Sequence, residues 1–341
     1  MFNQSSPIIS VKQLNKEIAN HRILNDISFS VYPGEIVGII GHSGSGKSTL
    51  LRCLDFLIAP TSGSISIAGF HTSSPIEKIS RTAFAKRVAY VSQSCGLFLA
   101  KTVFENIAYP LKVRCPEMTN SLIEEKVDDA LHFFNLYEKK HAYPSRLSGG
   151  QKQKVAIAIA IVSDPTVLLC DEITSALDPR STEDVADKLL QLNEERCITQ
   201  VFVSHEIEIM KKLCCQTLVM HQGSIAELGP TEKLFLNPHS TITEELFHTH
   251  SIAKGIYEYG ENEEILRLGF PKGLAVQGMI SKLIQSGGIS MNILSGDINL
   301  FRKTPLGFLI VALSGEKAQR DWAKSSLREK GVIVKQFQKS R

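Results

Sequence analysis

A pair of neighbouring motifs constrains the fold of this chain more strongly than any other feature of its sequence. The first is LSGGQ at residues 147–151, and the second is the apolar run at residues 167–170 that ends in Asp171 and Glu172. A Ser-Gly-Gly turn at the start of a helix exposes backbone N–H groups, which bind anions. Because this turn has no role in a phosphate site of its own chain, the pair predicts a two-fold dimer in which each chain completes a site of the other.

A phosphate-binding loop, GHSGSGKS, occupies residues 41–48. It follows the apolar run Ile36–Ile40, which is typical of a buried parallel strand, and precedes a helix predicted over residues 47–57. The glycines let backbone N–H groups turn toward a β-phosphate, Lys47 brings a positive charge to the β- and γ-phosphate oxygens, and Ser48 can ligate Mg²⁺. The motif alone does not separate ATPases from kinases and GTPases. The predicted nucleotide-binding residues of this loop are Gly41, His42, Ser43, Gly44, Ser45, Gly46, Lys47, Ser48 and Thr49.

Two carboxylates are predicted at the edge of the same sheet. Asp171 ends the apolar strand of residues 167–170, so its carboxylate is expected beside the phosphate loop, where it would hold Mg²⁺ through water. Glu172 follows and can orient an attacking water molecule. The alternative interpretation is an acidic pair that only caps a helix.

Gln93 and His205 follow two further predicted strands, at residues 88–91 and 198–203. The neutral Gln93 side chain can reach metal and water, and His205 can contact a γ-phosphate. Taken singly, Gln93 could be an ordinary surface residue and His205 a structural histidine, but their order along the chain favours functional roles. The candidate catalytic residues are Glu172, His205 and Gln93, and the candidate metal ligands are Ser48, Gln93 and Asp171.

In this order the motifs resemble the ATP-binding-cassette (ABC) ATPase family over about residues 8–247. The resemblance implies an α/β fold in which residues 1–247 form a P-loop nucleotide-binding domain. This domain would have a RecA-like core and a helical subdomain at about residues 94–162. Within that subdomain, Ser121 and Glu124 predict a capping box at a helix start. ATP and Mg²⁺ are the implied cofactors, and the implied assembly is a homodimer. The residues that the resemblance assigns to the ATP of the partner are Ser148, Gly149, Gly150, Gln151 and Asp178.

One position departs from the pattern of this family. Its members place an aromatic residue, which stacks on adenine, in the segment before the phosphate loop, whereas the matching position here is Ile18, with His21 nearby. Stacking on the base would therefore be lost. We expect weaker purine discrimination than in related ATPases, with ATP binding less than about 100-fold tighter than GTP binding.

Composition limits the possible partners. The chain has 38 Lys and Arg against 35 Asp and Glu, a near-neutral balance that does not favour nucleic acid as a partner. No apolar run reaches the roughly 18–20 residues of a membrane span, and residues 1–7 lack the pattern of a secretory signal. Seven cysteines without a C-x-x-C pair suit a reducing compartment. We therefore expect a cytoplasmic protein, and a soluble ABC ATPase that acts on nucleic acid is the less favoured alternative.

A second unit follows residues 248–264, which are interpreted as a linker. Apolar patterns over residues 265–337 predict the order β-α-β-β-α-β, a small α+β ferredoxin-like domain. Its Asn-Ile-Leu run, which begins at Asn292, resembles the NIL domain of the methionine-import ATPases, the MetN family. The resemblance implies that residues 265–341 form a regulatory domain that binds methionine, with Asn292 as the candidate ligand contact. A turn asparagine and a domain that only dimerises are the alternatives.

The resemblance as a whole implies the ATPase subunit of an ABC importer of methionine, peripheral at the cytoplasmic face of the inner membrane. Two copies would drive two integral-membrane permease subunits, and a substrate-binding lipoprotein would deliver the cargo. The apolar segment of residues 96–110 resembles the groove that receives a permease helix, although subdomain core would explain it too. Import of another amino acid or small cargo is the alternative function.

Overall fold

The computed structural model describes residues 6–72, 79–247, 263–271, 279–301 and 304–336. Contacts within the chain divide it into two compact units, Met1–Leu228 and Gly229–Arg341. Sequence analysis ended the first domain at Phe247, whereas the structure groups helices α8 (Thr231–Leu236) and α9 (Thr241–Phe247) with the second unit. Most of the predicted linker, residues 248–262, lies outside the described residues.

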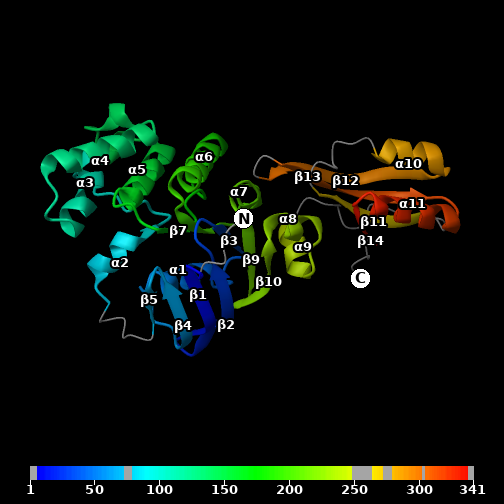
Figure 1. The fold of residues 1–341 in the computed structure, drawn as a ribbon, viewed down its shortest axis with the longest axis horizontal. Coiled ribbons are helices and arrows are strands. Elements are labelled where there is room, and N and C mark those ends of the chain that lie inside the picture. Colours follow the sequence, from blue (N-terminus) through cyan, green and yellow to red (C-terminus); the bar gives the residue numbers. More distant parts are fainter. Residues whose placement is uncertain (1–5, 73–78, 248–262, 272–278, 302–303, 337–341) are drawn as a thin grey trace. The chain divides into compact units, whose positions relative to one another are not determined.

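A six-stranded sheet forms the centre of the first unit, in the strand order β10-β9-β3-β8-β7-β6 (Figure 1). β3 pairs in parallel with β8 and β9, and β7 pairs in parallel with β6 and β8. Continuous Val, Ile and Leu runs are typical of parallel strands buried on both faces, and ligands bind at the carboxyl edge of such sheets. The bounds are β3 (Ile36–Ile40), β6 (Val88–Val91), β7 (Val167–Asp171), β8 (Thr199–Val203), β9 (Gln216–His221) and β10 (Ser224–Pro230).

The helix that follows β3 begins at the predicted position. α1 (Lys47–Leu54) starts at the phosphate loop but ends before the predicted Leu57, because Phe56 has a positive φ of 52° that a right-handed helix does not accommodate. The other helices next to this sheet are α2 (Arg81–Arg87), α6 (Pro179–Arg196) and α7 (Ile207–Leu213).

An antiparallel sheet in the same unit has the order β2-β1-β4-β5. β1 (Ile9–Ile18) and β2 (His21–Val31) form a hairpin whose two turn residues, Ala19 and Asn20, have positive φ values of 48° and 64°, as tight primed turns require. Apolar alternation in the sequence covers only residues 8–14 and 27–31, so both strands are longer than this pattern predicts, because register shifts within the pair interrupt it. β4 (Ser62–Ile67) and β5 (Phe70–His71) complete the sheet.

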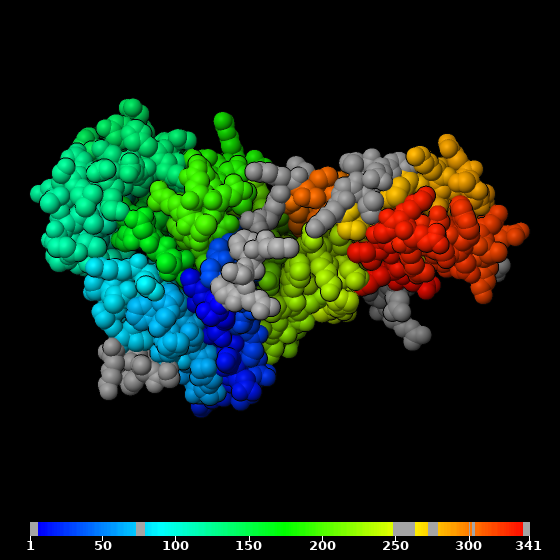
Figure 2. Space-filling view, viewed as in Figure 1, coloured from blue at the N-terminus to red at the C-terminus, as the bar shows by residue number. Residues whose placement is uncertain are grey.

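Three helices, α3 (Val103–Arg114), α4 (Asn120–Phe133) and α5 (Gly149–Ile161), lie in the predicted helical subdomain. In the space-filling view, the teal residues of α3 and α4 form a lobe at the upper left (Figure 2). The capping box predicted at Ser121 is wrong. Thr119 caps α4 instead, because its hydroxyl accepts a hydrogen bond from the backbone N–H of Leu122.

The second unit contains the predicted β-α-β-β-α-β order, and its strands form an antiparallel sheet in the order β12-β13-β11-β14. One face of this sheet packs against both helices through a core that includes Leu268, Val311, Leu283 and Leu327. In the sequence, the apolar pattern that predicts the first helix starts at Val276, which lies outside the described residues. The bounds are β11 (Glu263–Phe270), α10 (Met279–Gly287), β12 (Ser290–Phe301), β13 (Thr304–Ser314), α11 (Lys317–Glu329) and β14 (Ile333–Gln336).

Helix α8 covers the other face of the same sheet. Its Phe235 ring lies 5.0 Å from the ring of Phe301 and 5.4 Å from the ring of Phe308, measured between centroids. Arg267 of β11 lies on this face, and its guanidinium donates a hydrogen bond of 2.7 Å to the carbonyl oxygen of Phe235. Helices therefore cover both faces of the sheet around β11 and β13 within this unit, which explains why α8 and α9 group with it.

Candidate nucleotide-binding site

The phosphate loop between β3 and α1 is shaped by glycines. Gly44 and Gly46 have positive φ values of 79° and 100°, a conformation that favours glycine. A Cβ atom at Gly41 would lie 2.3 Å from the carbonyl oxygen of Met220, whereas the space beside Gly44 is open. The loop is thus packed closely on the side of β9 and accessible at Gly44, as a phosphate cradle requires.

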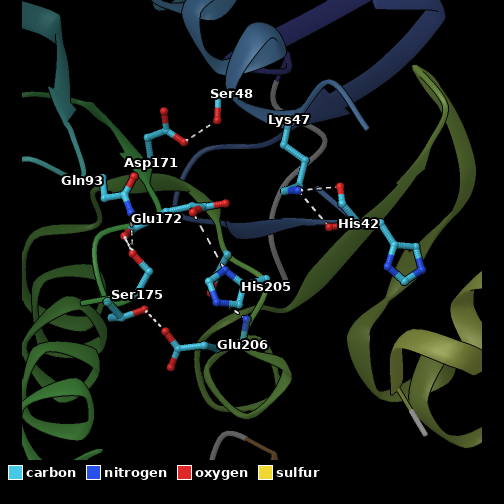
Figure 3. Close-up of polar contacts among 12 residues, drawn as sticks. His42, Lys47, Ser48, Gln93, Asp171, Glu172, Ser175, His205 and Glu206 are labelled. Atoms are coloured by element: carbon cyan, nitrogen blue, oxygen red, sulfur yellow. Dashed lines mark hydrogen bonds and ion pairs between the residues drawn. The ribbon is translucent and has the colours of Figure 1, made fainter. Parts of the chain in front are cut away.

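Lys47 extends its ammonium group across this loop (Figure 3). Its Nζ donates hydrogen bonds to the carbonyl oxygens of Gly41, at 2.8 Å, and His42, at 3.0 Å, and these use two of its three donors. Burial lowers the pKa of Lys47, while the negative charges of Glu172 and Asp171 oppose that shift. The third donor and the poorly solvated charge favour a phosphate oxygen as the next partner.

Ser48 and Asp171 lie together at the end of the loop, as the sequence analysis expected. The Ser48 hydroxyl donates a hydrogen bond of 3.0 Å to Oδ1 of Asp171, whose side chain is buried. Hydroxyl and carboxylate oxygens are the hard ligands that Mg²⁺ prefers, and Mg²⁺ commonly takes one or two protein ligands besides phosphate and water. No group of three His, Cys, Asp or Glu residues in the described ranges could hold a metal by itself. The residues present therefore fit a magnesium ion that arrives with a nucleotide.

Tyr90 of β6 is a further partner of Asp171, and sequence analysis missed it. The Tyr90 hydroxyl donates a hydrogen bond of 2.8 Å to Oδ2 of Asp171. Burial raises the pKa of Tyr90, and the hydrogen bond to Asp171 raises it further, so the phenol stays protonated and remains a donor. Tyr90 pairs with Leu169 of β7, and strand alternation then places the Tyr90 and Asp171 side chains on one face. The pairing register of β6 and β7 could have predicted this contact, but the register is known only once the two strands are known to be neighbours.

Glu172 and His205, two of the predicted catalytic residues, lie next to each other. Glu172 follows β7 with a positive φ of 49°, and its backbone N–H donates to the carbonyl oxygen of Val203 at 3.0 Å. One carboxylate oxygen lies 3.9 Å from Nδ1 of His205 (Figure 3). A left-handed conformation is uncommon for a non-glycine residue, and such residues cluster at functional sites.

Gln93, the third predicted catalytic residue, lies on the opposite side of Glu172. Its amide nitrogen donates a hydrogen bond of 3.0 Å to the hydroxyl of Ser175, which in turn donates to the carbonyl oxygen of Glu172 at 2.9 Å (Figure 3). In this arrangement Gln93 contacts Ser175 rather than the pair of Ser48 and Asp171. A role for Gln93 as a metal ligand stays a prediction.

The signature motif forms the start of α5. The Ser148 hydroxyl accepts a hydrogen bond from the backbone N–H of Gln151, and the Gln151 side chain accepts one from the backbone N–H of Ser148. Gly150 lies against α6, where a Cβ atom would come within 2.8 Å of Ser181. Asp178 caps α6 by accepting a hydrogen bond of 3.1 Å from the backbone N–H of Ser181.

These signature contacts are local. Among the described residues, none of the hydrogen bonds or ion pairs joins Ser148, Gln151 or Asp178 to the phosphate loop. The starts of both helices are also accessible to solvent, since Ser148, Gly149 and Asp178 are exposed. The arrangement therefore leaves the two helix starts available to another molecule, and their contact with the nucleotide of a partner stays a prediction.

Ile18 ends β1 and is 45% exposed. It pairs directly with His21 across the hairpin turn. An aliphatic side chain offers apolar contact but no ring to stack on a base. Weaker purine discrimination accordingly remains a prediction for this chain.

Known protein families match both units. The model of the ABC transporter family matches residues 24–175, and the model of the NIL domain matches residues 264–336. The described residues contain no helix long and apolar enough to cross a bilayer.

Among solved structures, the chain resembles the dimeric ATP-binding cassette MJ0796 bound to ADP and Pi, with a TM-score of 0.58 and 28% identity over 65% of this chain and 98% of that one. It also resembles cbiO1 of Clostridium perfringens, part of the ABC transporter complex cbiONQ, with a TM-score of 0.63 and 26% identity over 72% of this chain and 97% of that one. These likenesses confirm the ABC cassette fold.

Relatives match along the whole chain. The methionine import ATP-binding protein MetN of Chlamydia abortus is 92% identical over 100% of both chains. MetN of Chlamydia pneumoniae is 61% identical over 99% of this chain and 100% of its own, and MetN 1 of Bacillus cereus is 36% identical over 96% of both. With a cassette fold, an assembled phosphate site and a C-terminal NIL domain, this chain belongs to the MetN family of ABC transporter ATP-binding proteins.

Proposed function

We propose that this chain is the ATP-hydrolysing subunit of an ABC importer that takes up methionine. The observation that carries the proposal is the 92% identity to a methionine import ATP-binding protein over the full length of both chains. The geometry of the phosphate loop supports the proposal independently. Lys47 lies across the loop and Ser48 contacts Asp171 at its end, which is an arrangement suited to a nucleotide with Mg²⁺.

The proposed hydrolysis uses side chains that already lie together. Lys47 binds β- and γ-phosphate oxygens, and Ser48 and Asp171 hold Mg²⁺, which when bound would neutralise negative charge on those oxygens. Glu172 accepts a hydrogen bond from the attacking water and takes its proton. His205, 3.9 Å from the Glu172 carboxylate, contacts the γ-phosphate side of the site.

A homodimer would complete each site. The solved cassette MJ0796 is dimeric in a post-hydrolysis state bound to ADP and Pi. In this chain the exposed starts of α5 and α6 carry Ser148, Gly149 and Asp178, and a helix start attracts anions. In the proposed dimer these residues face the ATP bound by the partner.

A permease would dock on the apolar surface next to α3. Phe98 and Leu99 are 47% and 73% exposed, and Tyr109 and Val113 on α3 are also exposed. The rings of Phe98 and Tyr109 lie 4.9 Å apart in an edge-to-face arrangement. A contiguous exposed apolar patch of this kind marks an interaction site, so we assign residues 96–110 to the permease groove predicted from the sequence. Two such subunits would clamp two permease subunits at the cytoplasmic face of the inner membrane, with a substrate-binding lipoprotein on the other side.

Regulation by methionine would reside in the NIL domain. Asn292 lies on β12, an edge strand of its sheet, at the position opposite Ala312 of β13, and its side chain is exposed. An exposed amide has donor and acceptor groups for the polar end of an amino acid. Inhibition of transport would require methionine to bind one state of the transporter more tightly than another.

Transport assays test the function directly. The chain, reconstituted in liposomes with the permease subunits of a methionine importer, should drive ATP-dependent uptake of radiolabelled methionine. Glu172→Gln should bind ATP yet hydrolyse it at least about 100-fold more slowly, because the base is lost. Glu183→Gln, an exposed carboxylate on α6, is the matched control and should behave like the unaltered chain. Near-normal turnover by Glu172→Gln would remove Glu172 from its proposed role, and uptake of another amino acid instead would redirect the cargo.

Calorimetric titration of the full chain with L-methionine and other amino acids tests the regulatory site. We expect selective methionine binding that weakens about tenfold or more in Asn292→Ala, as expected for loss of a direct hydrogen bond. Asn299→Ala on the same strand is the matched control. Equal binding by both variants would exclude Asn292 as a contact, and no binding by the unaltered chain would exclude the NIL domain as a sensor of free methionine.

A further inference from the structure

The carboxylate of Asp171 has two different partners. Oδ1 accepts a hydrogen bond of 3.0 Å from Ser48, which is the side that faces the phosphate loop. Oδ2 accepts one of 2.8 Å from the hydroxyl of Tyr90. Ser48 and Asp171 take part in the proposed hydrolysis, whereas Tyr90 has no part in it.

Three elements are joined through Tyr90 and Asp171. β6 and β7 are parallel neighbours in which Tyr90 pairs with Leu169. Asp171, at the end of β7, contacts Tyr90 through one carboxylate oxygen and Ser48 of α1 through the other. Ser48, Asp171 and Tyr90 therefore form a chain of contacts from α1 through β7 to β6.

A tyrosine is suited to hold a carboxylate that must bind a cation. Rotation about the terminal torsion of an aspartate is broad, so a donor on Oδ2 fixes the plane of the carboxylate and keeps Oδ1 directed at Ser48. The phenol is a neutral donor. A lysine or arginine in its place would orient the carboxylate equally well but would cancel the charge that a divalent cation requires.

We propose that Tyr90 is a positioning residue for the divalent cation, which holds Asp171 in the orientation that binds Mg²⁺ without neutralising it. The proposal rests on the proposed ATPase function and adds to it a residue outside the sequence motifs. Because Tyr90 precedes Gln93 by three positions on the same segment, it also ties the end of β6 to the metal site.

The test compares Tyr90→Phe with Tyr32→Phe, a matched removal of a hydroxyl at an exposed position outside the site. The first readout is steady-state ATP hydrolysis as a function of Mg²⁺ concentration. Tyr90→Phe should raise the Mg²⁺ concentration for half-maximal hydrolysis about tenfold, the scale expected for one hydrogen bond to a charged group, and should change turnover at saturating Mg²⁺ by less than about threefold. Tyr32→Phe should change neither.

The second readout is the binding of a fluorescent ATP analogue with Mg²⁺ and with EDTA. Tyr90→Phe should weaken binding only when Mg²⁺ is present, whereas a merely structural tyrosine would weaken both or neither. An unchanged Mg²⁺ requirement, or equal losses with and without the metal, would overturn the proposal. If Tyr90→Phe does not fold, Tyr90→Met, which also lacks the hydroxyl, decides, and an unchanged Mg²⁺ requirement would then overturn the proposal. Absence of any nucleotide binding by the unaltered chain would instead overturn the proposed function itself.

Discussion

Each unit of this molecule contains a buried charged side chain, and the two side chains differ in the partners that surround them. In the cassette, Asp171 is 7% exposed and its carboxylate is held by two neutral donors, Ser48 and Tyr90. In the C-terminal unit, Arg267 is 3% exposed and its guanidinium is surrounded by its own chain. It donates to the carbonyl oxygen of Phe235, lies 4.3 Å from the centroid of the Phe308 ring, and reaches Glu244 at 4.0 Å.

Under the proposed function, this difference separates a buried charge that binds a cation from one that stabilises the fold. Asp171 keeps its charge unneutralised at the carboxyl edge of an open sheet, where a cation can reach it. Arg267 donates a hydrogen bond to the backbone of α8, lies near a carboxylate of α9 and contacts an aromatic ring, so it holds the two helices against the sheet. Burial of either charged group is costly to the folded state, but only Asp171 is placed to bind another molecule.

Replacing Asp171 should produce the largest effect on activity and little effect on stability. Asp171→Asn keeps the shape but removes the charge, and we expect ATP hydrolysis to fall at least about 100-fold because the metal site is lost. The melting temperature should stay the same or rise, since burial of a carboxylate is costly to the folded state. ATPase assays and thermal unfolding measure the two effects. A large drop in melting temperature would mean that Asp171, like Arg267, stabilises the fold.

Replacing Arg267 should give the opposite result. Arg267→Ala removes the cation–π contact, leaves the Phe235 carbonyl without this donor and opens a cavity between α8 and the sheet. We expect a loss of about 3 kcal/mol in the free energy of unfolding of the second unit, with near-normal ATP hydrolysis by the cassette. Arg328→Ala, at an exposed position on α11, is the matched control and should change stability by less than about 0.5 kcal/mol. Chemical denaturation with separate probes of the two units would measure this. Unaltered stability of Arg267→Ala would contradict the structural role.

The same contrast explains which features the sequence could predict. Lys47, Ser48, Asp171 and Glu172 lie in motifs whose local backbone determines where their side chains point, so their meeting at one edge was foreseeable. Tyr90 meets Asp171 across 81 residues, and that contact depends on which strands become neighbours. No local pattern encodes it.

The C-terminal unit shows the same limit. Its β-α-β-β-α-β order followed from apolar periodicity, which is a local property of each element. The packing of α8 on the second face did not, because Phe235 and Arg267 lie 32 residues apart and the polar stretch between them suggested a linker. The wrong capping box at Ser121 has a smaller cause: Thr119, two residues earlier, has the same hydroxyl chemistry, and the backbone selects between them.

Asp55 is a half-buried charge, intermediate between the other two, and it should give the smallest effect. It ends α1, where a negative charge is unfavourable, and burial raises its pKa to about 7, although Arg81 and Arg114 oppose the shift. Because the folded state holds this proton more tightly than the unfolded state, Asp55 lowers stability progressively as pH rises from about 4 to about 7, and the full penalty remains above that range.

Asp55→Asn should therefore stabilise the cassette by about 1–2 kcal/mol at pH 8 and by much less near pH 4.5, after allowance for the arginines and partial solvent exposure. Denaturation curves at the two pH values measure the difference, and Asp26→Asn, at an exposed position, is the matched control. A stabilisation that is the same at both pH values would show that the carboxylate is already neutralised by its arginines. Asp55 would then belong with Arg267 as a compensated charge rather than with Asp171.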